Sequence, residues 1–146
     1  TRRSSDLDRQ AVKYSARACS ALTAPMPHAP HPNFLREAMR SDLQKADSCM
    51  EFLVQPRTSN AMSIEDSMSE WKESQAPFYK VATIRIPQQI FDTPEQNKFC
   101  ENLSFTPWHA LVEHKPLGGI NRMRKIIYEQ ISRVRHEMNS TERLEP

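Results

Sequence analysis

Glycine and cysteine are scarce in this chain. Two glycines stand against eleven prolines in 146 residues, so the sequence offers few of the tight turns that a small self-contained β fold uses. The three cysteines (Cys19, Cys49 and Cys100) are widely spaced, odd in number and without a CxxC pair. They predict neither a disulfide framework nor a zinc knuckle, and they favour a reducing compartment.

A strong charge of either sign and a long hydrophobic run are also missing. Twenty basic against eighteen acidic side chains give a net charge of +2, which argues against binding to nucleic acid or to an anionic membrane. No apolar run is long enough to span a bilayer, and the opening TRRSSDLDRQ lacks the apolar centre of a signal peptide. We expect one modest core, and because the chain begins without Met we expect it to be a piece of a larger protein.

Hydrophobic periodicity predicts an alternation of strands and helices. A proline-rich, extended connection is expected at 20–32 and a polar loop at 58–77, with at most a short helical turn. The regular elements expected are strands at 11–19, 49–57 and 79–87, a helix from about Asn33 to Ala46 with Leu35, Met39 and Leu43 on one face, and a short helix capped by Thr93.

The last helix carries the most informative pattern. At about 100° per residue, its apolar side chains fall within roughly 80° of one another, and three polar residues fall within roughly 40° at the edge of that stripe. We expect the stripe to pack inward. The stripe consists of Ile120, Met123, Ile127, Ile131, Val134 and Met138, and the edge of Arg124, Tyr128 and Arg135.

The edge residues admit two interpretations. In the first, Tyr128 completes the core with its hydroxyl in water, and the arginines are solvated helix charges. In the second, Tyr128 is a functional phenol. An adjacent guanidinium favours the phenolate, which is a ligand for iron.

Arg124 four residues before Tyr128, with Arg135 seven after it, resembles the proximal haem-binding motif of catalases. The run FCENLSFTPWHALVEHKPLGGINRMRKIIYEQISRVRHEMN (99–139) is similar to the C-terminal block of small catalase-like haem proteins of microbes and fungi. Supporting similarity extends back through FYKVATIRIPQQIF and NFLREAMRSDLQKADSCMEFLVQPRT, so it covers nearly the whole chain.

The resemblance implies a role for each matching residue. Tyr128 would be the axial ligand of a b-type haem iron, and Arg124 would bond its phenolate oxygen. Arg135 would lie toward the haem edge, and Phe105 would match an aromatic position on the proximal side. The implied fold class is α+β, a partial catalase-like antiparallel β-barrel with helices that ends in a haem-facing helix. It would form one incomplete domain, with barrel strands, helix and connections at 1–98, the wrapping segment and haem helix at 99–139, and a tail at 140–146.

The distal side of such an enzyme has no counterpart here. Catalase chemistry needs a distal histidine that moves the peroxide proton, and no segment resembles that motif, so no catalytic residue is assigned. Structural roles are expected for the five histidines, because His109, His114 and Cys100 match no compact zinc template. Gly118 and Gly119 either present helix amides to an anion or, as we expect, permit a tight turn and close packing.

Two functions follow from the sequence. The first is the C-terminal part of a haem-dependent catalase- or peroxidase-like enzyme acting on hydrogen peroxide or organic hydroperoxides. The alternative is a non-catalytic remnant or interaction module without bound haem. Unpaired strand edges and an open apolar face predict marginal stability or association, such as a homo-oligomer. The cytoplasm is the expected location; peroxisomal targeting is the alternative, although the ending RLEP is not an SKL-type signal.

Overall fold

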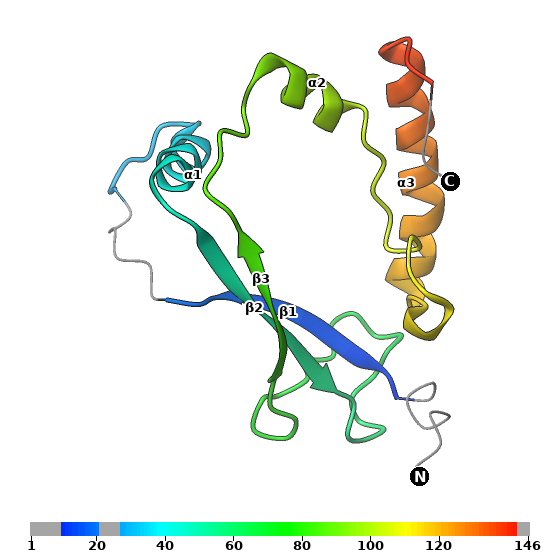
Figure 1. The fold of residues 1–146 in the computed structure, drawn as a ribbon. Coiled ribbons are helices and arrows are strands. Elements are labelled where there is room, and N and C mark those ends of the chain that lie inside the picture. Colours follow the sequence, from blue (N-terminus) through cyan, green and yellow to red (C-terminus); the bar gives the residue numbers. More distant parts are fainter. Residues whose placement is uncertain (1–9, 21–26, 143–146) are drawn as a thin grey trace. The chain divides into compact units, whose positions relative to one another are not determined.

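The computed structural model of the chain describes residues 10–20 and 27–142 and has an α+β architecture (Figure 1). Three strands form one antiparallel sheet in the order β1-β2-β3, and three α-helices accompany it. The elements are β1 Val12–Ala18, α1 Phe34–Lys45, β2 Ser48–Pro56, β3 Tyr79–Ile86, α2 Pro94–Glu101 and α3 Gly119–Met138. All six were predicted from the sequence within a few residues. The proline-rich connection expected at 20–32 lies partly outside the described residues.

The chain forms two compact units, whose boundary falls within α2. Unit 1 comprises Thr1–Val12, Pro56–Pro77 and Lys98–Pro146, and unit 2 comprises Lys13–Gln55 and Phe78–Asn97. No helix in the described parts of the chain is long and apolar enough to cross a membrane.

In unit 2 the sheet forms because its strands are rich in β-branched and aromatic residues. The β2–β3 pairing runs from Ser48 opposite Ile86 to Val54 opposite Tyr79. Val81 has no partner in this register, since Phe52 pairs with Ala82 and Leu53 with Lys80, which is the geometry of a β-bulge.

Helix α1 attaches to the segment that follows β3. The backbone N–H of Gln89 donates to the Leu43 carbonyl at 2.8 Å, and the Asp47 carboxylate accepts from Arg85 Nε at 2.9 Å and from the Gln88 backbone N–H at 2.8 Å. The expected apolar face of α1 is only partly used, because Leu43 is buried while Leu35 and Met39 are exposed.

The cysteine prediction was wrong. Cys19, directly after β1, and Cys49 in β2 form a disulfide with a Cα–Cα distance of 5.6 Å, and Cys100 is free and exposed. The spacing of cysteines along the sequence does not show that antiparallel pairing brings these two side by side.

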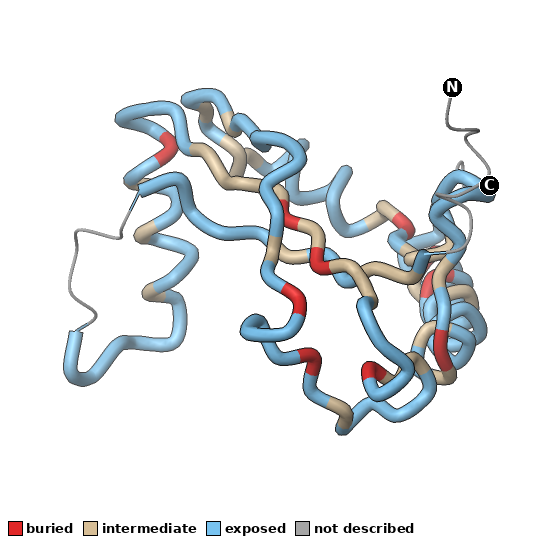
Figure 2. The backbone as a smooth tube through the Cα atoms, turned by 90° about the horizontal axis from the view of Figure 1, so that it is seen from below, coloured by how far each residue is buried: buried red, intermediate tan, exposed pale blue. Residues whose placement is uncertain are grey.

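The core of unit 1 is small. Met62, Trp71 and Ala76 from the polar loop are buried together, with Ala11 and Ile64 packed against them. The Trp71 indole N–H donates to the Ser63 carbonyl at 3.0 Å, so the buried ring has its polar atom satisfied. Burial elsewhere is sparse, and Figure 2 shows the buried residues scattered along the backbone.

Candidate functional site

The candidate site lies on helix α3. A close backbone contact fixes the N-terminus of this helix. Gly118 precedes the helix with φ +87°, a conformation that favours glycine. A Cβ atom at this position would lie 2.6 Å from the Ile64 carbonyl oxygen. This confirms that Gly118 permits a tight turn and close packing.

An internal carboxylate supplies the anion at this helix end. Glu65 accepts from Arg122 at 3.0 and 2.7 Å, in a bidentate ion pair. Its hydrogen bonds with Arg122, and to a lesser extent the backbone N–H of Gly119, lower the pKa of the Glu65 carboxyl; the same pair raises the pKa of Arg122. One of the two glycine amides considered for an external anion, that of Gly119, therefore already serves Glu65.

The packed side of α3 is polar. Its two buried residues are Ser132 and His136. The Ser132 hydroxyl lies 2.5 Å from that of Ser104, and the ring nitrogens of His136 lie 2.7 Å from the Ser132 carbonyl oxygen and 2.8 Å from that of Asn102. A guanidinium nitrogen of Arg135 donates to the Leu103 carbonyl. Hydrogen bonds thus hold residues 102–104 against the helix.

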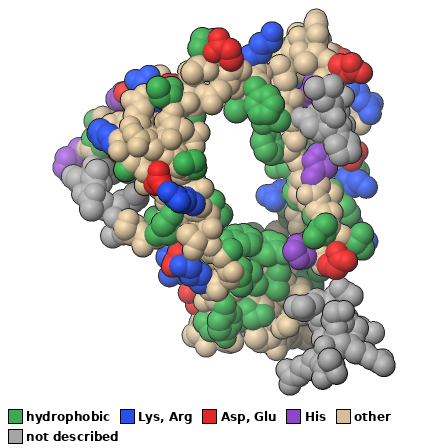
Figure 3. All heavy atoms as spheres, viewed as in Figure 1, with side chains coloured by type: hydrophobic (Ala, Val, Ile, Leu, Met, Phe, Trp, Pro, Cys, Tyr) green, Lys and Arg blue, Asp and Glu red, His purple; other side chains and the backbone are tan. Residues whose placement is uncertain are grey.

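The apolar stripe of α3 does not pack inward, which corrects the expectation from its periodicity. Every member is exposed, namely Ile120, Met123, Ile127, Ile131, Val134 and Met138. Figure 3 shows hydrophobic side chains at the surface of the face it displays, some of them on α3. The periodicity identified the helix and its apolar face correctly, but it could not show which face packs within the chain.

The sequence singled out Arg124, Tyr128, Arg135 and Phe105, and these residues differ in their exposure and contacts. Arg124 and Tyr128 stand one turn apart on α3, both exposed, Tyr128 at 37%. Neither side chain has a hydrogen-bond partner within 10–20 and 27–142. Arg135 is half-buried, and its Nε is buried without a partner in the same residues.

Phe105 belongs to the segment that packs on α3, but its own side chain is 73% exposed. It follows Ser104, whose partner Ser132 lies one turn beyond Tyr128. The structure therefore places the backbone at Phe105 near the helix and leaves its ring free to contact another surface.

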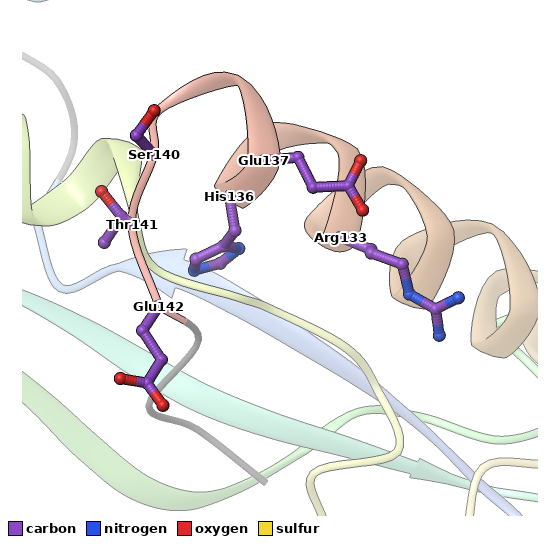
Figure 4. A pocket seen from close by; sticks show the side chains of 6 residues that line it. All are labelled: Arg133, His136, Glu137, Ser140, Thr141 and Glu142. Carbon is purple, nitrogen blue, oxygen red and sulfur yellow. The ribbon is translucent and has the colours of Figure 1, made fainter.

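Two cavities adjoin α3. The first, about 440 Å³, is lined by Arg133, His136 and Glu137 from the helix and by Ser140, Thr141 and Glu142 after it (Figure 4). The second, about 510 Å³, lies by the helix N-terminus, with Arg57, Glu65, Trp108, Lys115 and Arg122 among its lining residues. Tyr128 lines neither cavity.

Sequence reasoning missed Glu65 and Ser132, two of the residues that anchor the helix, and it gave His136 only the structural role expected of all five histidines. Ser132 and His136 share one face of α3, but serine and histidine there are equally typical of a solvated surface. Glu65 comes from a loop without periodicity, 57 residues before Arg122, so only the fold brings the pair together. No cluster of three or more His, Cys, Asp or Glu side chains suited to a metal ion occurs in the described residues.

Comparisons with protein families, with curated proteins and with solved structures found no match for this chain.

Proposed function

We propose that this chain is the haem-binding C-terminal part of a catalase- or peroxidase-like protein that acts on hydrogen peroxide or organic hydroperoxides. In this proposal Tyr128 is the axial ligand of a b-type haem. The observation that carries it is the placement of Arg124 and Tyr128 one turn apart, beside an exposed apolar stripe, with no hydrogen-bond partner for either side chain in the described part of the chain. A phenol and a guanidinium so placed are available to an external group.

The donor set fits a tyrosinate-ligated haem chemically. Tyrosinate is an anionic oxygen donor that stabilises ferric iron, and a haem held this way supplies redox chemistry with peroxide. Arg124, one turn away on the same helix, would supply a positive charge near the iron-bound phenolate. The Nε of Arg135 is buried with an unused hydrogen-bond donor, which an acidic group at the ligand edge would satisfy only if the Arg135 side chain moved outward.

The apolar stripe has a role in this arrangement. Ile127 and Ile131 flank Tyr128 along the helix, and both are exposed. A flat apolar ligand lying on this face would remove these side chains from water, at about 25 cal/mol per Å² buried. Exclusion of water would also strengthen the interaction between Arg124 and the phenolate.

The sheet is consistent with part of a larger barrel. Antiparallel strands β1, β2 and β3 leave β1 and β3 as edge strands, and all but one of the β3 residues are exposed. We propose that further strands of a catalase-like barrel pair with these edges in the parent protein. The distal, proton-transferring histidine would come from that part, and the cytoplasm remains our proposed location.

The test is a haemin titration of the purified chain followed by its visible spectrum. Tyr128→Phe is the test variant, and Tyr79→Phe, which removes another exposed phenol, is the matched control. We expect one haem per chain and a phenolate charge-transfer band that Tyr128→Phe abolishes and Tyr79→Phe retains. Arg124→Gln should weaken binding, because the phenolate then lacks its neighbouring cation.

Equal binding by wild type and Tyr128→Phe would contradict the axial assignment. Absence of binding, both alone and with the missing half of the parent protein, would favour the non-catalytic remnant. The exposed stripe would then serve as an interaction surface.

A further inference from the structure

Strand β1 buries little of its surface. Its burial pattern includes no buried side chain, and five of its seven residues are exposed. On the sheet the Tyr14 ring stacks on that of Phe52, with 5.4 Å between the ring centroids. The hydrophobic effect therefore contributes little to holding β1 on the sheet.

The disulfide ties down the end of this strand. The backbone N–H of Cys19 donates to the Cys49 carbonyl at 3.1 Å, and the sulfur bond joins the same two residues. Their Cα–Cα distance of 5.6 Å is inside the usual range of about 4.4 to 6.8 Å, so the backbone accommodates the bond without separating the strands. Because the two cysteines are 30 positions apart, the covalent ring encloses α1.

The two bonded cysteines lie at the surface. Cys19 is exposed and Cys49 is half-buried, so we expect a small thiol to reach the Cys19 sulfur. Accessible disulfides are the ones that exchange readily, whereas structural disulfides are commonly shielded. A third cysteine, Cys100, is free and exposed and provides an internal reference for thiol reactivity.

We infer that Cys19 and Cys49 form a reversible thiol–disulfide pair that controls the attachment of β1 to the sheet. This inference does not rest on the proposed haem site. A thiolate of the glutathione class attacks the Cys19 sulfur, forms a mixed disulfide and releases the Cys49 thiolate. A second thiolate then attacks the glutathione sulfur, releases the Cys19 thiolate and leaves with the first as an oxidised dimer, so two electrons pass to the protein pair.

Oxidation by a hydroperoxide closes the pair again. The Cys19 thiolate attacks the O–O bond, which yields a sulfenic acid and an alcohol, or water when the oxidant is hydrogen peroxide. The Cys49 thiol then displaces water from the sulfenic acid and forms the disulfide. The closed state holds β1 covalently, whereas in the open state the strand depends on non-covalent contacts, the Tyr14 stack among them.

The test equilibrates the full wild-type chain in buffers of graded ratio of reduced to oxidised glutathione and then alkylates free thiols with a polymer-bearing maleimide. We expect chains with one reactive thiol to be replaced by chains with three as the ratio of reduced to oxidised glutathione rises. Hydrogen exchange at the same ratios should show amides of residues 12–18 exchanging at least tenfold faster in the open state. Amides of α3 should not change.

Each outcome decides the inference. A pair that stays oxidised at every ratio would identify a fixed structural bond, and equal exchange of β1 in both states would show that the bond does not control the strand. Cys100→Ser should leave the titration unchanged, and Cys19→Ser should reproduce the fast exchange without reductant. The wild-type comparison holds even if that variant folds poorly, because both states come from one chain. Haem binding is measured separately, so failure of one proposal leaves the other intact.

Discussion

The hydroxyl groups of Ser104 and Ser132 lie 2.5 Å apart, both buried, and connect the segment before Phe105 to the centre of α3. Together with the contacts of His136 and Arg135, this bond fixes the helix through its polar side. Buried polar groups that satisfy one another are costly to disrupt, because removal of one leaves its partner unsatisfied.

The first prediction concerns His136. Its replacement by alanine removes the contact with the Asn102 carbonyl and leaves that oxygen without its side-chain partner, so we expect the free energy of unfolding to fall by about 1 to 3 kcal/mol. Urea titration followed by circular dichroism measures it. Arg133→Ala, an exposed change on the same helix, should stay within about 0.5 kcal/mol. Equal effects of the two variants would mean that the His136 contacts do not anchor α3.

The two adjacent glycines make a second, paired prediction. Gly118→Ala should destabilise unit 1 by about 1 to 3 kcal/mol, because φ is +87° and the new Cβ would meet the Ile64 carbonyl oxygen. Gly119→Ala is the control. It starts the helix, and its Cβ would lie 3.6 Å from flexible ends of Arg122 and Glu65, so it should be neutral or stabilising. Thermal unfolding of both variants compares them, and an equal loss at both positions would rule out the close-contact explanation.

Acidification should weaken unit 2 through Asp47. Its pKa is lowered, chiefly by the Gln88 backbone N–H and then by Arg85, so its contribution to stability is present above the ordinary carboxyl pKa of about 4 and is lost as pH falls through the lowered pKa. Urea titrations between neutral and strongly acidic pH should therefore show a decline that Asp47→Asn reduces.

Asp42→Asn, a change within α1, serves as the control for Asp47, since it removes the same charge from a carboxylate without a hydrogen bond in the described part of the chain. A decline of the same slope in Asp47→Asn and wild type would show that the Asp47 contacts do not stabilise the folded state.

The disulfide should also raise the global stability of unit 2. A bond closing a span of 30 residues reduces the entropy of the unfolded chain, and by loop length we expect it to contribute between about 3 and about 4.7 kcal/mol. Urea titration of oxidised and reduced wild-type chain gives the difference. Cys100→Ser should show the same difference, and a value near zero would indicate that the two cysteines do not restrict the unfolded chain.

The exposed stripe of α3 should promote association. Ile127→Lys combined with Ile131→Lys should shift the chain toward monomer in sedimentation and lower its binding of an apolar dye, with unchanged helix content. Gln130→Lys with Glu137→Gln adds the same charge outside the stripe and is the control. If both doubles dissociate the protein equally, charge rather than apolar contact governs association.

Local pattern was sufficient to predict the secondary structure. The alternation in β3, the spacing in α3 and the Thr93 cap, whose hydroxyl accepts from the Gln96 N–H at 3.3 Å, are signals carried by neighbouring residues. Each depends on the chain within a few positions, which is why strands and helices were placed within a few residues of their bounds.

What could not be predicted depends on residues far apart in sequence. Cys19 and Cys49 are brought together by strand pairing, and Glu65 and Arg122 by the fold of a loop. The sequence also could not show which face of α3 packs. An apolar stripe indicates a face suited to packing, but it does not show whether the surface that covers it belongs to the same segment of chain. The assignment of Tyr128 rests on resemblance and stays a proposal.

The polar packing of α3 has a geometric consequence. Apolar contacts tolerate rotation of a helix about its axis, whereas hydrogen bonds are directional and lose their strength when the helix turns. The bonds of Ser132, Arg135 and His136 therefore fix the rotation of α3 about its axis, with the apolar stripe left exposed. The backbone at Tyr128 is therefore held in one orientation. A ligand that binds Tyr128 would not need to rotate the helix.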